Sequence, residues 1–144
     1  MADILHKIEI KASRARIYDA LTTAEGLSSW WTRGTKAEPT VGAVAEFPFR
    51  DGTFVQKMRI VDLQPGRRVA WVCIAGMDDW MNTEISFDLS DEGDQTCVRF
   101  AHKGWPESPD FRAHCSYRWA YFLRSLKLVM QTGKGNPHPE DTAA

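Results

Sequence analysis

The stretch SPDFRAHCSYRWAYFLRSLKLVMQTG, residues 108–133, decides the fold of this chain. Ser108 suits an N-cap, Pro109 the first helical position and Gly133 the C-cap, so the stretch predicts one helix ending near Thr132. At 1.5 Å per residue this helix is roughly 36 Å long, enough to cross a whole sheet. Its apolar side chains recur at spacings of three and four, which predicts one buried face: Phe111, Cys115, Trp119, Phe122, Leu126, Val129 and Met130.

The chain before this helix alternates apolar and polar residues in runs of strand length. Turn signals such as Asp51-Gly52 and Pro65-Gly66 separate the runs, which is typical of an antiparallel meander. Two short helical segments, 14–22 and 25–31, follow the first run. The expected strands cover residues 4–11, 41–49, 53–63, 67–75, 80–89 and 96–102. Pro48 limits ladder bonding, so 41–49 should lie near an edge of the sheet, whereas both faces of 67–75 are apolar, which predicts a central strand.

This order of elements predicts an α+β helix-grip fold. A curved antiparallel sheet of about six to seven strands would wrap around the long C-terminal helix, and the two short helices after strand 1 would plug one end. The gap between sheet and helix would then form a pocket. We predict one domain over residues 1–133 and a flexible C-terminal tail over 134–144.

Charge and composition exclude several classes of function. The formal net charge of -1 lacks the concentrated basic surface that nucleic-acid binding needs. No stretch approaches the 18 apolar residues typical of a membrane span, and residues 1–13 do not resemble a signal peptide. The three cysteines are widely spaced and form no CxxC motif, which favours free thiols and a cytoplasmic location.

The chain carries no strong catalytic or metal-binding motif. Its four histidines form neither His-x-His nor HExxH, so we predict no metal and no cofactor. GxSxG is absent, and a buried Cys73 would be inert. No catalytic residue is assigned; His102, in the inward register of its strand, is the one candidate for a proton shuttle. Glu84 faces solvent or the pocket, depending on which face of its strand is buried.

Six tryptophans in 144 residues are more than a core of this size needs. Ligand pockets combine apolar walls with a few polar groups, so the aromatic excess predicts a cavity. In the pair Trp30-Trp31 we place Trp31 at the pocket and Trp30 in the plug. The predicted ligand-binding residues are Trp31, Phe47, Gln56, Met58, Trp71, Phe87, His102, Trp119 and Phe122.

Nine segments follow one another in a characteristic order and spacing: Ile8 to Ile10, Ala12-Ser13, Ile17 to Thr22, Glu25 to Trp31, Val41-Gly42, Asp51-Gly52, Val61 to Pro65, Lys103 to Trp105 and Leu123 to Lys127. Together they resemble the helix-grip superfamily called SRPBCC, or START/Bet v 1-like. Within it, the chain is most similar to the subgroup of the C-terminal domain of the activator of the Hsp90 ATPase (AHSA1-like). The resemblance implies a cavity between sheet and long helix for a hydrophobic or amphipathic molecule.

Three functions follow as predictions. The first is non-catalytic binding of a small hydrophobic molecule such as a lipid. The alternative is a cyclase or dehydratase type of enzyme that uses the same cavity, with His102 as acid or base. The second alternative is a protein-interaction or chaperone-regulating module. Tyr117, Tyr121 and Leu128 form a second stripe on the long helix, which predicts a homodimer patch.

Overall fold

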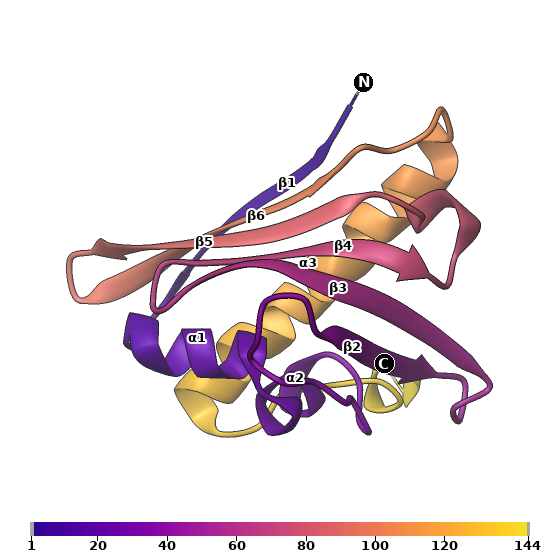
Figure 1. Ribbon diagram of the computed structural model, residues 1–144. Coiled ribbons are helices and arrows are strands. Elements are labelled where there is room, and N and C mark those ends of the chain that lie inside the picture. The colour runs from indigo at the N-terminus through magenta and orange to yellow at the C-terminus, as the bar shows by residue number, and fades with distance from the viewer. Residues whose placement is uncertain (1, 144) are drawn as a thin grey trace.

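The structure, a computed structural model, describes residues 2–143. One antiparallel sheet curves around a long helix, and two short helices follow the first strand (Figure 1). This arrangement confirms the predicted α+β helix-grip class, with six strands. The elements are β1 (Ile4–Ile10), α1 (Arg14–Thr22), α2 (Ala24–Trp30), β2 (Val44–Phe49), β3 (Phe54–Gln64), β4 (Arg68–Ala75), η1 (Asp78–Trp80), β5 (Glu84–Glu92), β6 (Gln95–Lys103), α3 (Pro109–Thr132) and η2 (Glu140–Ala143).

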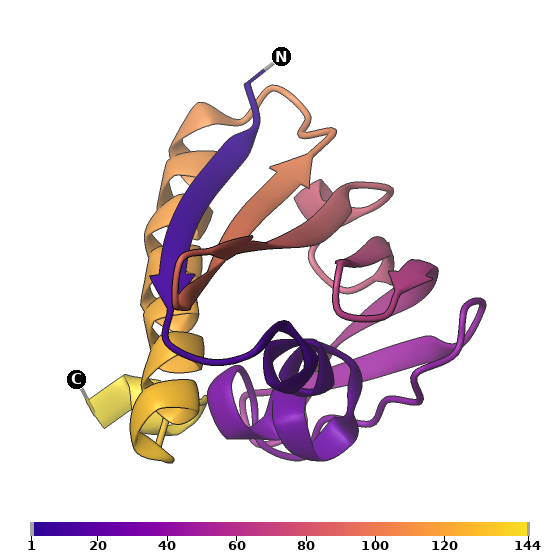
Figure 2. The ribbon, with the colours of Figure 1, turned by 90° about the vertical axis from the view of Figure 1, so that its left-hand side faces the viewer.

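The sheet has the strand order β1-β6-β5-β4-β3-β2, so the first strand pairs with the last. β2 is an edge strand, as expected from Pro48, which cannot donate to a ladder. β4 lies between β5 and β3, as its two apolar faces predicted. Figure 2 shows α3 along one side of the curved sheet, with α1 and α2 closing one end.

The helix α3 has the predicted length, but only one of its predicted caps forms. Gly133 has a φ of 86° and donates its backbone N–H to the carbonyl of Val129, as a C-cap does. Ser108 makes no side-chain capping bond, and its buried Oγ has no partner within residues 2–143. Its ψ of 72° differs from the 153° of Ser13, whose Oγ caps α1 by accepting from Arg16.

The strand predicted to begin at Trp80 begins at Glu84 instead. Residues 78–80 form a 3₁₀ turn, and Asn82 has a φ of 66°, which a regular strand does not allow. Thr83 stabilises this turn by donating from Oγ1 to the carbonyl of Trp80 at 2.6 Å. The alternating pattern of the sequence continues through this turn, so it did not mark the boundary.

Aromatic rings fill most of the space between the sheet and α3. The centroid of Trp31 lies 4.4 Å from that of Phe47, and Trp119 lies 4.5 Å from Phe100. Trp30 is fully buried beneath α1, where its Nε1 donates to the carbonyl of Ala20 at 2.8 Å. Burying rings of this size contributes a large part of the stability of a small domain.

The segment after α3, predicted to be a flexible tail, packs back against the domain as far as it is described. Asn136 donates its backbone N–H to Oγ of Ser125 at 2.7 Å, and His138 donates its backbone N–H to the carbonyl of Trp31 at 2.7 Å. Arg33 forms an ion pair with Glu140 at 2.5 Å.

None of the helices in residues 2–143 combines the length and the apolar composition of a membrane-spanning helix.

Candidate functional site

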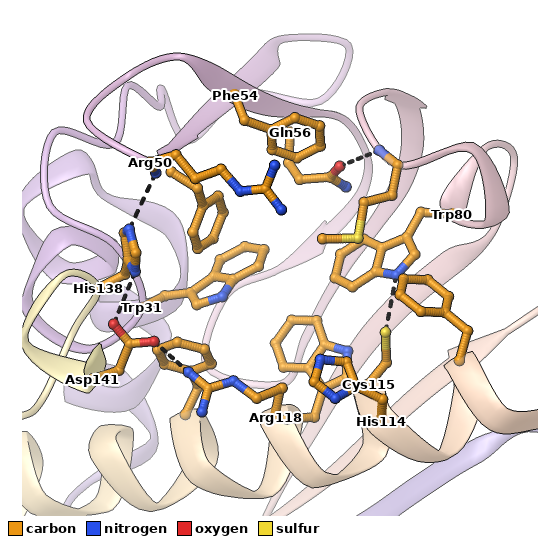
Figure 3. A pocket seen from close by; sticks show the side chains of 15 residues that line it. Trp31, Arg50, Phe54, Gln56, Trp80, His114, Cys115, Arg118, His138 and Asp141 are labelled. Atoms are coloured by element: carbon orange, nitrogen blue, oxygen red, sulfur yellow. Dashed lines mark hydrogen bonds and ion pairs between the residues drawn. The ribbon is translucent and has the colours of Figure 1, made fainter. Parts of the chain in front are cut away.

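A half-open cleft of about 400 Å³ lies between α3, the β2–β3 hairpin and the C-terminal segment (Figure 3). The aromatic core beneath it is closely packed, so the cleft occupies the end of the groove near β2 and β3. Its lining residues are Trp31, Phe49, Arg50, Phe54, Gln56, Met77, Trp80, Phe111, His114, Cys115, Arg118, Trp119, Phe122, His138 and Asp141.

Three indoles form a continuous apolar wall of this cleft. Trp119, on α3, lies between the other two: its ring centroid is 5.0 Å from that of Trp31 and 5.8 Å from that of Trp80. The Nε1 atom of Trp80 contacts Sγ of Cys115 at 3.5 Å. Burial raises the pKa of the Cys115 thiol, so this group is a weak nucleophile.

Gln56, on β3, supplies an amide to the wall of the cleft. Its Oε1 accepts from the backbone N–H of Met77 at 2.6 Å, and its Nε2 lies 3.6 Å from Sγ of Cys73. A Cβ at Gly76 would lie 1.8 Å from Oε1 of Gln56, and Gly76 has a φ of 128°. The close approach of this backbone to the buried amide therefore depends on glycine at position 76.

A buried carboxylate, Asp141, ties the C-terminal segment to α3. It accepts from Nη2 of Arg118 and lies 2.8 Å from Nδ1 of His138. Nε2 of the same imidazole accepts from the backbone N–H of Arg50 at 3.2 Å, so Nδ1 carries the proton and donates to Asp141. One chain of hydrogen bonds thus joins α3, the C-terminal segment and the β2–β3 turn.

The structure brings four of the nine predicted ligand-binding residues to the cleft and leaves five in the packed core. Trp31, Gln56, Trp119 and Phe122 line the cleft. The other five are not among its lining residues and are almost fully buried, because the rings on both sides fill the space that the prediction left open: Phe47, Met58, Trp71, Phe87 and His102. Ligand binding by any of the nine residues stays a prediction.

His102, the candidate acid or base, is fully buried and both its ring nitrogens have partners. Nδ1 accepts from Nε1 of Trp119 at 3.1 Å, so the proton is on Nε2, which donates to Oγ1 of Thr83 at 2.8 Å. Burial lowers the pKa of this histidine from 6.5 to about 3. The ring is therefore neutral and fully hydrogen-bonded in the core, away from the cleft.

Glu84 faces outward, 3.8 Å from Arg68, and is not a pocket acid. Tyr117 is 70% exposed, whereas Tyr121 and Leu128 are half-buried, and the guanidinium of Arg118 lies over the Tyr121 ring at 5.0 Å. In the described part of the chain, no three His, Cys, Asp or Glu side chains form a group that could hold a metal ion.

Several lining residues were absent from the sequence prediction. Phe111 and Cys115 share the helical stripe of Trp119, so periodicity alone could have added them. Arg50, His138 and Asp141 carried no such signal, because they lie in a turn and in a segment without periodicity. Only the folding of the C-terminal segment onto the hairpin brings these three together.

Comparison with known proteins adds a family and several structural relatives. The family described as "Activator of Hsp90 ATPase homolog 1-like protein" matches residues 11–131. The solution structure of the Aha1 dimer from Colwellia psychrerythraea is 43% identical; the match covers 94% of this chain and 100% of that chain, with a TM-score of 0.84. A comparison with curated proteins finds no match.

More distant structures share the fold alone. Protein SSP2350 from Staphylococcus saprophyticus is 16% identical, with 93% of this chain and 95% of that chain covered and a TM-score of 0.80. CalU16 from Micromonospora echinospora is 21% identical, with 96% and 71% covered and a TM-score of 0.75. At these identities the comparison concerns architecture and carries no information about the occupant of the cleft.

Proposed function

The chain belongs to the family of activator of Hsp90 ATPase homolog 1-like proteins, in the SRPBCC superfamily. We propose that it binds a small hydrophobic or amphipathic molecule between the sheet and α3. The observation that carries the proposal is the cleft of about 400 Å³ with three indoles on its wall. Ligand sites are typically concave and apolar, of roughly 300–1,000 Å³, with a few polar groups that orient the ligand.

Binding is favoured over catalysis at His102 and Asp141, because both groups are engaged within the protein. The imidazole of His102 is held between Trp119 and Thr83, outside the cleft. The carboxylate of Asp141 is engaged by Arg118 and His138. A general acid or base must reach its substrate within hydrogen-bond distance, and these two groups are committed to partners within the protein.

The first prediction tests occupancy of the cleft with the neutral fluorescent probe N-phenyl-1-naphthylamine. Met77→Trp places a bulky ring in the cleft from a half-buried loop position, so we expect the affinity for the probe to fall at least about tenfold. The wild-type protein should bind the probe, increase its emission and gain in melting temperature, because a ligand that binds only the folded state stabilises it.

Met81→Trp is the matched control for this experiment. Met81 is exposed, four positions further along the chain and outside the cleft, so the same substitution there should leave probe binding unchanged. Equal loss of affinity in both variants would place the probe elsewhere. Absence of binding to the wild-type protein would contradict the proposed function.

We also propose that the chain forms a homodimer through the predicted patch of Tyr117, Tyr121 and Leu128. Two observations support this: Tyr117 is 70% exposed, and the 43% identical relative from Colwellia psychrerythraea is described as a dimer. A cytoplasmic location likewise stays a proposal, supported by three cysteines that are all free.

The second prediction tests the dimer by sedimentation equilibrium. The wild-type protein should have the mass of a dimer, and Tyr117→Arg should have the mass of a monomer, because it places like charges opposite each other across a two-fold axis. Arg124→Ala, an exposed change on the same helix, should remain a dimer. A dimeric Tyr117→Arg variant would exclude this face, and a monomeric wild-type protein would exclude the assembly.

A further inference from the structure

Some charged side chains around the cleft have a counter-ion and one does not. Arg118 and Asp141 neutralise each other, and His138 completes the surroundings of the carboxylate. Arg50 differs from Arg118, since no carboxylate within residues 2–143 lies within ion-pair distance of its guanidinium. Its guanidinium lies over the ring of Phe54, whose centroid is 5.7 Å from Cζ. The cleft therefore carries one positive charge without a counter-ion.

The backbone conformation of the β2–β3 turn places Arg50 at the cleft. Its φ is 52° and that of Asp51 is 56°, a left-handed conformation that costs free energy for residues other than glycine. The backbone N–H of Arg50 donates to Nε2 of His138, which ties the turn to the C-terminal segment. Figure 3 shows the Arg50 side chain extending from this turn over the cleft, beside Phe54 and Gln56.

The wall on the other side of the cleft is apolar and also offers one free donor. The indole N–H groups of Trp80 and Trp119 are engaged by Cys115 and His102. The indole N–H of Trp31 donates to no protein group in the described part of the chain, although the ring lines the cleft. An occupant thus meets apolar rings, one unpartnered guanidinium, one unpartnered indole N–H and the imidazole of His114, which stacks on Phe111.

We infer that the cleft binds an organic anion: a molecule whose apolar body lies along the indoles and whose carboxylate, sulfonate or phosphate group is held by Arg50. This inference rests on the proposed function and specifies its ligand class. A guanidinium beside apolar walls binds such a group by short, charge-assisted hydrogen bonds, often in pairs. A cationic ligand would meet Arg50 as a like charge, while the carboxylate of Asp141 is already occupied.

Two probes with the same aromatic body separate the charge from the apolar contact. 8-Anilinonaphthalene-1-sulfonate carries a sulfonate that N-phenyl-1-naphthylamine lacks. We expect the wild-type protein to bind the sulfonate at least about tenfold more tightly than the neutral probe, and more weakly as salt screens the contact. Arg50→Gln should remove this preference, because the affinity for the sulfonate then falls to that for the neutral probe.

The controls separate a local contact from net charge. Arg124→Gln removes one positive charge from an exposed position of α3 outside the cleft, and should retain the preference. Arg50→Lys keeps the charge and should retain part of the preference for the sulfonate. If both probes bind equally to the wild-type protein, or if Arg50→Gln keeps the preference, the inference is wrong while the proposed function stands. If neither probe binds, the proposed function and the inference both fail.

Discussion

Acidification from pH 7 to pH 4.5 is expected to lower the free energy of unfolding by about 2–3 kcal/mol through His102 alone. In the folded protein, burial lowers the pKa of this imidazole from 6.5 to about 3, so the ring stays neutral. The unfolded chain takes up a proton below pH 6.5, which favours unfolding. The stability associated with neutral His102 is therefore complete above pH 6.5 and is lost as the pH falls toward 3.

Urea denaturation at a series of pH values measures this effect. His102→Gln removes the titration, so its free energy of unfolding should fall less steeply in this window by up to about 1.4 kcal/mol per pH unit. Ile60→Val is the control, because it removes one buried methylene and keeps His102. It should be less stable at every pH but have the slope of the wild-type protein. Equal slopes for wild type and His102→Gln would contradict the assignment.

Trp119→Ala is expected to lower the free energy of unfolding by about 3–5 kcal/mol, the range for truncation of a large buried aromatic side chain. The ring is almost fully buried and contacts Trp31 and Phe100. Its Nε1 also donates to His102, so truncation leaves a buried imidazole nitrogen without a partner. Chemical denaturation at neutral pH measures the change.

Two further variants divide this loss into its parts. Trp119→Phe keeps a ring but removes the donor, so we expect an intermediate loss of about 1–3 kcal/mol. Arg124→Ala, five positions along the same helix and exposed, should change stability by less than about 0.5 kcal/mol. Both substitutions introduce the same strong helix former, so similar losses for Trp119→Ala and Arg124→Ala would contradict the assignment of the loss to burial at position 119.

Local patterns predicted the elements because each pattern reflects a local cause. The apolar spacing between Phe111 and Met130 requires a helix with one buried face, and Gly133 ends that helix by its left-handed backbone. The alternation around Val98 and Phe100 requires a strand with one buried face. The boundary at Glu84 was missed because Asn82 and Thr83 form their turn by hydrogen bonds that alternation does not reveal.

The cleft could be predicted in kind but not in place. The excess of aromatic residues predicted that such side chains line it, and Trp31, Trp119 and Phe122 do. Phe47, Trp71 and Phe87 carry the same aromatic signal and are buried in the core. Which rings fill the interior depends on the curvature of the sheet and the angle of α3, and both are properties of the assembled fold.

By itself, the sequence determined the helix-grip architecture, the edge position of β2 and the apolar character of the site, because periodicity, turn residues and composition act over a few neighbouring residues. Only the tertiary structure decided that Arg50 and His138, 88 positions apart, meet at the cleft, and that His102 is a neutral core residue. Long-range hydrogen bonds and burial produce both results, and neither leaves a periodic trace in the chain.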